Sequence, residues 1–234
     1  MEIAGLQKMT LLDYPGKVAC TVFLQGCNYR CPFCHNSELI PSKGEPLMTE
    51  AAFLEFLRKR KGLLDGVCVS GGEPTLQPEL PSFLENIKAL GYPVKLDTNG
   101  SRPEVLKQLA SRGLVDYVAM DVKNSPARFG ETAGSKDWHR TPIEESLRFL
   151  LNGRLPFELR TTVVEELHSE TDILQMGQWV FALGAKTPVK KWYLQPFADR
   201  DSVLYTGLHA PDGEKMAHFC TLLAPFAELV AIRG

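Results

Sequence analysis

The chain has 234 residues, a formal net charge of −2, 44% hydrophobic residues and 23% charged residues. This composition is typical of an ordinary globular protein of one domain, and its weakly acidic balance argues against nucleic-acid binding through charge. No apolar run approaches the length of a membrane span, and residues 1–5 lack the basic start of a signal peptide. We therefore expect a protein of the reducing cytoplasm, with neither a membrane nor a nucleic acid as partner.

Short apolar runs rich in β-branched residues alternate along the chain with amphipathic stretches. The predicted strands are residues 18–24, 67–69, 94–96, 117–120, 157–164 and 191–194, and the predicted helices are residues 49–61, 79–90, 103–110, 142–151, 171–183 and 212–223. This alternation predicts parallel strands joined by right-handed crossovers.

A full eight-unit barrel typically needs about 250 residues. Six strand–helix units fit this chain better, so we expect an α/β fold in the form of an open, partial (β/α)6 TIM-like barrel. We expect a single domain over residues 1–234. The polar stretch 124–141 is long enough to be a functional loop or an insertion.

Three cysteines directly follow the first predicted strand, in a loop over residues 25–36. Cys27, Cys31 and Cys34 have C-x3-C-x2-C spacing, whereas the other three cysteines lie in apolar runs typical of buried hydrophobic side chains. Structural zinc takes four protein ligands, and a [4Fe–4S] cluster held by three cysteines leaves one iron open. Zinc would need His35 as fourth ligand, which is disfavoured because adjacent residues rarely both reach one tetrahedral metal. An iron–sulfur site is favoured over zinc.

A glycine pair followed by an acid comes directly after the second predicted strand, as Ser70-Gly71-Gly72-Glu73-Pro74. Paired glycines let the backbone approach a ligand closely, and the acid suits an ammonium group. A phosphate-binding loop would need a lysine that is absent here. A plain turn is the alternative.

Further polar residues follow the later strands, at the edge where active sites of parallel α/β folds gather. Asp97 and Asn99 follow the third strand in Asp-Thr-Asn-Gly, which is also a common turn sequence. Asp121 and Lys123 follow the fourth strand and could pair with each other. Arg160 lies inside the fifth strand, where it would enter either a buried salt bridge or a ligand site.

The three-cysteine loop, with an aromatic residue before its third cysteine and Gly-Gly-Glu one strand later, resembles the radical S-adenosylmethionine (SAM) enzymes. The resemblance implies that Cys27, Cys31 and Cys34 hold a [4Fe–4S] cluster whose free iron binds the amino and carboxylate groups of SAM. One electron from the cluster would then cleave SAM to methionine and a 5′-deoxyadenosyl radical.

The same resemblance implies a cofactor site beyond the cysteines. Phe33 would pack on the adenine, and Glu73 would bind the methionyl amino group. His35 would either contact the cofactor or only make a hydrogen bond that supports the residues binding it. The residues implied are Phe33, His35, Gly71, Gly72, Glu73, Asp97, Asn99, Asp121, Lys123 and Arg160. The family often has a histidine after the Pro-aromatic pair of strand six, but here Ala198 follows Phe197.

Three runs resemble a narrower branch: Leu-Asp-Tyr-Pro-Gly-Lys at 12–17, Gln-Gly-Cys-Asn at 25–28 and Cys-His-Asn at 34–36. They are similar to the anaerobic ribonucleoside-triphosphate reductase activating proteins and, next, to pyruvate formate-lyase activating enzymes. This implies a glycyl-radical enzyme as partner, an electron donor such as flavodoxin or ferredoxin, and no general acid or base. The alternatives are a small-molecule radical enzyme such as the 7-carboxy-7-deazaguanine synthases, which share Gly-Gly-Glu-Pro, and a zinc module.

Overall fold

The computed structural model describes residues 1–41 and 44–233, which form two compact units. The first unit consists of residues 1–28, 38–98 and 104–119, and the second of residues 29–37, 99–103 and 120 onward. Residues 42, 43 and 234 lie outside the described part. The single domain over residues 1–234 stays a prediction.

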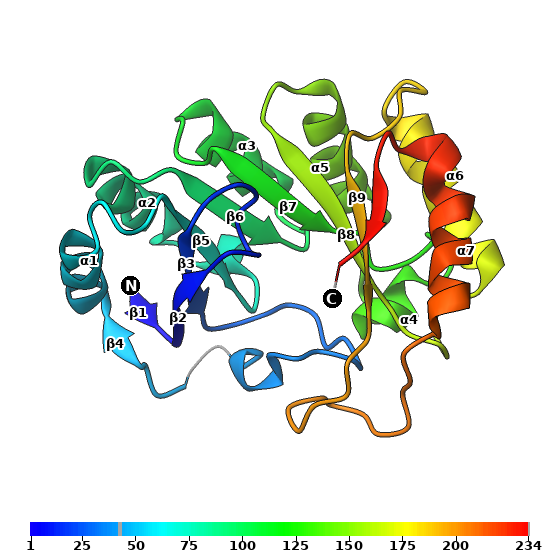
Figure 1. The fold of residues 1–234 in the computed structure, drawn as a ribbon, viewed down its shortest axis with the longest axis horizontal. Coiled ribbons are helices and arrows are strands. Elements are labelled where there is room, and N and C mark those ends of the chain that lie inside the picture. Colours follow the sequence, from blue (N-terminus) through cyan, green and yellow to red (C-terminus); the bar gives the residue numbers. More distant parts are fainter. Residues whose placement is uncertain (42–43, 234) are drawn as a thin grey trace. The chain divides into compact units, whose positions relative to one another are not determined.

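The first unit is built on strands that are buried along most of their length. The parallel strands are β3 (Ala19–Leu24), β5 (Gly66–Gly71) and β6 (Val94–Thr98), with β3 paired to β5 and β5 to β6. The apolar runs of β3 and β5 are typical of strands covered on both faces. An antiparallel strand, β2 (Gly5–Thr10), precedes β3 and pairs with it (both blue in Figure 1). A separate two-stranded ladder joins β1 (Glu2–Ile3) and β4 (Met48–Thr49).

Helices of the first unit cover this core through apolar faces. They are α1 (Glu50–Lys59), α2 (Leu80–Ala89), α3 (Pro103–Ser111, in this unit from Glu104 on) and a short 3-10 turn, η2 (Pro74–Leu76). Thr49 caps α1 by accepting a hydrogen bond from the Ala52 amide. Phe53 of α1 and Phe83 of α2 are fully buried, with ring centroids 5.7 Å apart.

The second unit has parallel strands and its own buried core. Strand β7 (Tyr117–Asp121) ends in it, and β8 (Phe157–Val163), β9 (Trp192–Pro196) and β10 (Val230–Ile232) pair in that order. Its helices are α4 (Phe129–Ala133), α5 (Arg140–Asn152), α6 (Glu170–Leu183) and α7 (Gly213–Leu223). Helices α6 and α7 lie side by side (yellow and orange-red in Figure 1).

The predicted α/β fold with parallel strands is confirmed, and each of the six predicted strand–helix pairs has a counterpart. Four strands of the described part were not predicted, namely β1, β2, β4 and β10, and neither was helix α4, which forms inside the stretch 124–141. The start of α5 was also predicted wrongly, because Pro142 is its third residue and not its first. A proline is tolerated there because the first amides of a helix lack an intrahelical acceptor. Among the described residues, no helix is long and apolar enough to cross a membrane.

Candidate active site

The glycine pair at the end of β5 lies against the backbone that leads into the cysteine loop. A β-carbon on Gly71, which has φ of +130°, would lie 2.2 Å from the Leu24 carbonyl oxygen, and one on Gly72 would lie 2.2 Å from that of Gly26. The Gly72 amide donates to Leu24 O (3.0 Å) and the Glu73 amide to Gly26 O (2.7 Å). Both glycines are therefore required for packing against Leu24 and Gly26, at the start of the loop that carries Cys27.

Glu73 is a buried carboxylate with a fixed orientation. Its side chain caps η2, and its Oε1 accepts hydrogen bonds from the Thr75 amide (3.1 Å), the Thr75 hydroxyl and the Thr98 hydroxyl (2.8 Å). Only 1% of the residue is exposed. These donors hold a negative charge at the carboxyl ends of β5 and β6, where it suits an ammonium ligand.

Asp97 is paired with a lysine that the sequence analysis missed. Lys95 is fully buried in β6, donates to Asp97 Oδ1, and its Nζ lies 3.8 Å from Cys68 Sγ. Residues two apart in a strand point to the same face, so the pairing of Lys95 with Asp97 could have been found from the sequence. The ligand role of Asp97 stays a prediction.

Asn99 forms the local turn that its sequence suggested. Its Oδ1 accepts a hydrogen bond from the Ser101 amide at 2.9 Å, and Gly100 has φ of +77°. The side chain belongs to a residue only 6% exposed. The turn is thus present, and contact with a cofactor stays a prediction.

The three predicted cysteine ligands are divided between the units. Cys27 belongs to the first unit, whereas buried Cys31 and half-buried Cys34 belong to the second, where the Cys34 amide donates to Cys31 O (3.1 Å). None of the six cysteines, all of which lie in the described part of the chain, forms a disulfide bond. Within the part of the chain that the structure describes, no three His, Cys, Asp or Glu side chains converge as around a metal ion. Phe33, in the same loop, is 4% exposed.

His35 is bound to the segment that follows β9. Its Nε2 donates to the Ala198 carbonyl (2.6 Å), and its ring stacks on Phe197 with centroids 5.8 Å apart. The Ser202 hydroxyl donates to the His35 carbonyl at 2.6 Å. The structure therefore shows His35 as a hydrogen-bonding residue, and Ala198, where the family often has histidine, is its acceptor.

Asp121 lies between two cations in the second unit. Lys123 Nζ is 2.9 Å from its Oδ2 and Arg160 Nε is 3.1 Å from its Oδ1. The pairing of Asp121 with Lys123 considered from the sequence is therefore present, and of the two alternatives for Arg160 the structure shows a salt bridge. Burial alone would lower the pKa of Lys123, but the Asp121 carboxylate and the thiols of Cys31 and Cys34 raise that pKa above its usual value. Lys123 therefore stays protonated and positively charged, close to the predicted ligands Cys31 and Cys34.

The chemistry of these groups fits an iron–sulfur cluster with SAM. Cysteine thiolates are the ligands that iron–sulfur clusters use, and none of these cysteines is tied up in a disulfide bond. Each unit carries a group whose charge suits part of SAM: in the first, the buried carboxylate of Glu73 suits an ammonium group, and in the second, the cation of Lys123 suits a carboxylate.

Comparison with known proteins gives the family. The family model described as "Radical SAM superfamily" matches residues 21–170. The protein named "Putative glycyl-radical enzyme activating enzyme MJ1227" of Methanocaldococcus jannaschii is 33% identical over 184 residues, which are 76% of this chain and 75% of that protein.

Two further relatives are matched over a smaller share of both chains. A pyruvate formate-lyase-activating enzyme of Clostridium pasteurianum is 35% identical over 132 residues (53% of this chain, 52% of that one). A 7-carboxy-7-deazaguanine synthase of Thermococcus kodakarensis is 28% identical over 147 residues (53% and 55%). The chain thus matches about half the length of these two relatives.

The crystal structure of Streptococcus suis SuiB bound to precursor peptide SuiA matches with a TM-score of 0.71 at 13% identity, over 92% of this chain and 48% of that one, which shows the shared fold. The family model over residues 21–170 and the 33% identity to the Methanocaldococcus jannaschii protein show that the chain belongs to the radical SAM superfamily of enzymes, whose cofactors are a [4Fe–4S] cluster and SAM.

Proposed function

We propose that this protein is an activating enzyme that generates a glycyl radical on a partner enzyme, and that the partner is an anaerobic ribonucleoside-triphosphate reductase. The observation that carries the first part is the 33% identity to a protein named as an activating enzyme, over three quarters of both chains. The second part rests on the resemblance of residues 12–17, 25–28 and 34–36 to the reductase activating proteins.

The side chains have separate tasks in this proposal. When bound, the cluster and SAM supply a 5′-deoxyadenosyl radical that removes a hydrogen atom from the Cα of a glycine in the partner. Cys27, Cys31 and Cys34 hold the cluster, Glu73 binds the ammonium group of SAM, and Lys123 faces its carboxylate. The protein positions its cofactors and excludes water, and no general acid or base is needed.

The run at residues 12–17 supports the branch by resemblance alone. Tyr14 is buried against Gly66, the first residue of β5, and Asp13 accepts a hydrogen bond from the Thr21 hydroxyl of β3. Gly66 lies at the opposite end of β5 from Gly71. The run therefore stabilises the amino ends of β3 and β5, whereas the candidate site uses their carboxyl ends.

The test begins with anaerobic reconstitution of the protein. We expect electron paramagnetic resonance (EPR) of the reduced protein to show a [4Fe–4S]⁺ signal that changes when SAM is added. Cys31→Ala should abolish this signal, whereas Cys68→Ala should retain it, because Cys68 lies buried inside β5. Zinc without iron or sulfide in the purified protein would overturn the proposal.

The partner is tested in a second step. With a low-potential donor such as flavodoxin or ferredoxin, we expect a glycyl-radical signal on the anaerobic reductase. A radical that forms only on pyruvate formate-lyase would replace the reductase by the partner that the similarity to the Clostridium pasteurianum enzyme suggests. Because an exposed cluster needs a reducing compartment, we place the protein in the cytoplasm.

The second candidate is a small-molecule radical enzyme, favoured by the similarity to a 7-carboxy-7-deazaguanine synthase. It predicts consumption of SAM that a pterin stimulates in the absence of any partner protein. The absence of pterin stimulation, together with radical formation on a partner, would exclude it.

A further inference from the structure

The stretch 124–141 contains helix α4, whose carboxyl end contacts the cysteine loop within the second unit. The Arg30 amide donates to the Ala133 carbonyl at 2.9 Å, and Cys31 Sγ lies 3.7 Å from the same oxygen. Gly134 ends α4 with φ of +60°, and a β-carbon there would lie 1.9 Å from the Arg30 carbonyl oxygen. The end of α4 therefore fixes the backbone next to Cys31.

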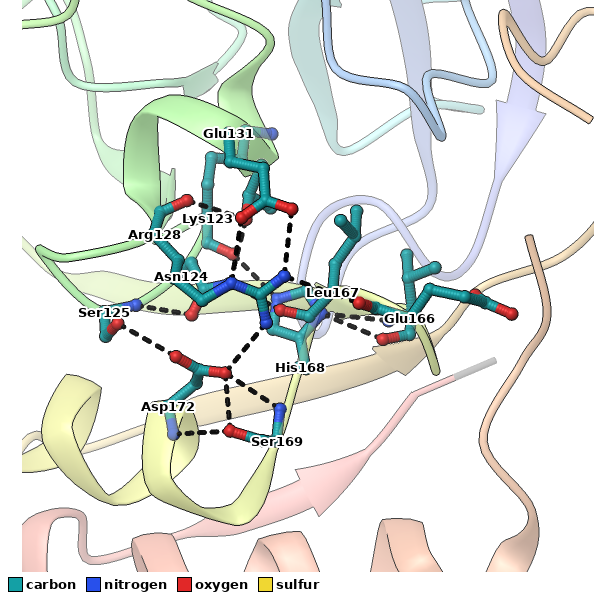
Figure 2. Close-up of polar contacts among 12 residues, drawn as sticks. Lys123, Asn124, Ser125, Arg128, Glu131, Glu166, Leu167, His168, Ser169 and Asp172 are labelled. Atoms are coloured by element: carbon teal, nitrogen blue, oxygen red, sulfur yellow. Dashed lines mark hydrogen bonds and ion pairs between the residues drawn. The ribbon is translucent and has the colours of Figure 1, made fainter. Parts of the chain in front are cut away.

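Arg128, the residue before α4, connects this helix to α6. Its guanidinium makes a two-point ion pair with Glu131 of α4 (2.9 and 3.0 Å), and its Nη1 donates to Asp172 Oδ2 at 3.1 Å (Figure 2). The Asp172 side chain is 8% exposed. Because the guanidinium binds Glu131 at two points and is also held by the buried Asp172 carboxylate, it fixes both the orientation of α4 and its distance from α6.

Asp172 is held in turn by the start of α6. Its Oδ2 accepts from the amide and hydroxyl of Ser169 (3.0 and 2.6 Å), and the Ser169 hydroxyl accepts from the Asp172 amide, which forms a capping box. Its Oδ1 accepts from the Ser125 hydroxyl at 3.2 Å (Figure 2). The carboxylate thus joins the cap of α6, the start of the stretch 124–141, and Arg128.

The same framework fixes Lys123. Buried Asn124 donates to the Thr132 hydroxyl of α4 and to the Leu167 carbonyl, each at 2.8 Å. His168, which is 1% exposed, donates from Nε2 to the Lys123 carbonyl at 2.9 Å (Figure 2). One hydrogen-bonded network therefore contacts the chain at two predicted site residues, Cys31 and Lys123.

We propose that Arg128 and Asp172 are positioning residues, which hold α4 so that Ala133 and Gly134 set the geometry of Cys31 for the iron–sulfur cluster. This inference rests on the proposed function in one respect, namely that Cys31 is a cluster ligand. It assigns to the stretch 124–141 the task of shaping the cluster loop.

The contact at Gly134 is tested by Gly134→Ala, with Gly113→Ala as its matched control. Gly113 has a similar φ of +65° but no heavy atom within 4 Å of an added β-carbon, so both variants strain the backbone and only the first pushes on Arg30. After anaerobic reconstitution, we expect Gly134→Ala to release iron to a chelator roughly 10-fold faster than Gly113→Ala, as loss of an outer-shell contact typically does. We also expect an altered EPR spectrum of the reduced cluster in Gly134→Ala only.

The network itself is tested by Arg128→Ala, with Arg148→Ala as control, because Arg148 forms an exposed ion pair with Glu144 in the same unit. We expect faster iron release and a changed EPR spectrum in Arg128→Ala, and wild-type behaviour in Arg148→Ala. Arg128→Lys should restore part of the wild-type behaviour, because it keeps a cation opposite Asp172. A loss of stability alone would not change the spectrum of the clusters that remain.

The outcomes separate this inference from the proposed function. A wild-type protein that assembles no cluster overturns the proposed function itself. The positioning role is overturned if the wild-type protein has a normal cluster and each variant behaves like its control. That means equal iron release and identical spectra for Gly134→Ala and Gly113→Ala, and likewise for Arg128→Ala and Arg148→Ala. Should Gly134→Ala not fold, as judged by circular dichroism of the apoprotein, the arginine variants decide.

Discussion

Glu73 combines burial with a negative charge that nearby hydroxyl and amide groups orient through Oε1. Glu73→Gln would keep an acceptor oxygen for Thr75 and Thr98 but remove the charge. Because a hydrogen bond to a charged group contributes about 1.5–3 kcal/mol, we expect SAM to bind roughly 10- to 100-fold more weakly. Titration of the cluster EPR signal with SAM measures this, and the exposed Glu79→Gln serves as control. Equal affinity in both variants would contradict the assigned role.

Lys95 is a buried cation whose partner is two residues away. Lys95→Met would leave Asp97 without its buried lysine, so we expect the free energy of unfolding of the apoprotein to fall by about 3–5 kcal/mol. The matched change Lys107→Met removes an exposed pair with Glu104 in the same unit and should cost less than about 1 kcal/mol. Urea denaturation compares the two variants. Similar losses of unfolding free energy would show that the buried pair stabilises the protein no more than the exposed pair does.

We expect His168 to make the stability of the apoprotein depend on pH. Burial lowers its pKa below the usual 6.5, so the unfolded chain binds a proton more readily than the folded protein. Its contribution is present above pH 6.5 and is lost as the pH falls from there, with a slope of up to about 1.4 kcal/mol per pH unit. Urea midpoints between pH 7.5 and 5.5 should show this slope, and His168→Gln should flatten it. An unchanged slope in the variant would assign the effect to other groups.

At the scale of residues, the sequence predicted those site residues and pairings that lie within a few positions of one another. The cysteines and Glu73 were named from motifs of a few residues, and the Asp121–Lys123 pairing was considered because strand neighbours two apart share a face. The pairing of Arg128 with Asp172 joins residues 44 positions apart, and no local pattern connects them. Such long-range pairs become visible only when the fold brings the chain segments together.

At the scale of elements, the glycine pair at the end of β5 sets how closely two segments pack. Gly72→Ala would place a β-carbon against Gly26 O, and such overpacking typically costs about 1–3 kcal/mol. We expect lower stability of the apoprotein and poor iron retention. Gly213→Ala, where an added β-carbon meets nothing within 4 Å, should change stability by less than about 1 kcal/mol. Thermal denaturation and iron analysis check this, and a Gly72→Ala protein that retains iron like wild type would contradict it.

The elements that the sequence missed have weak local signals. Helix α4 has five residues and includes glycine and threonine, which have low helix propensity, so contacts with other segments hold it. Strand β10 has only three residues. The six predicted strands were found because buried β-branched runs give a strong signal over several residues.

At the scale of the whole molecule, we expect the cluster to stabilise the folded protein. A metal site formed by the folded chain binds the native state in preference to the unfolded state, and each kcal/mol of net binding raises Tm by roughly 2–4 °C for a protein of this size. Anaerobic calorimetry should therefore show a higher Tm for the reconstituted protein than for the chelated protein. Cys31→Ala should show no such difference, and an equal rise in that variant would contradict cluster binding through Cys31.

The repeated strand–helix alternation predicted the fold class, and the resemblance of the cysteine loop and Gly-Gly-Glu predicted the family. The partner is a different matter, since a second protein is recognised by surface shape and charge, which spacing does not encode. The run at residues 12–17 illustrates this, because Tyr14 is buried against Gly66 at the start of β5 and is not part of an exposed surface.

The close approach of Gly71 and Gly72 to Leu24 and Gly26 also matters for protein engineering. A designer who transplants the eight residues from Cys27 to Cys34 into another scaffold moves the thiols but leaves behind the strand that shapes their entry. A transferable module must therefore include at least a pair of adjacent parallel strands, one leading into the cysteines and the other ending in Gly-Gly-Glu, and the two must be copied together in their native register.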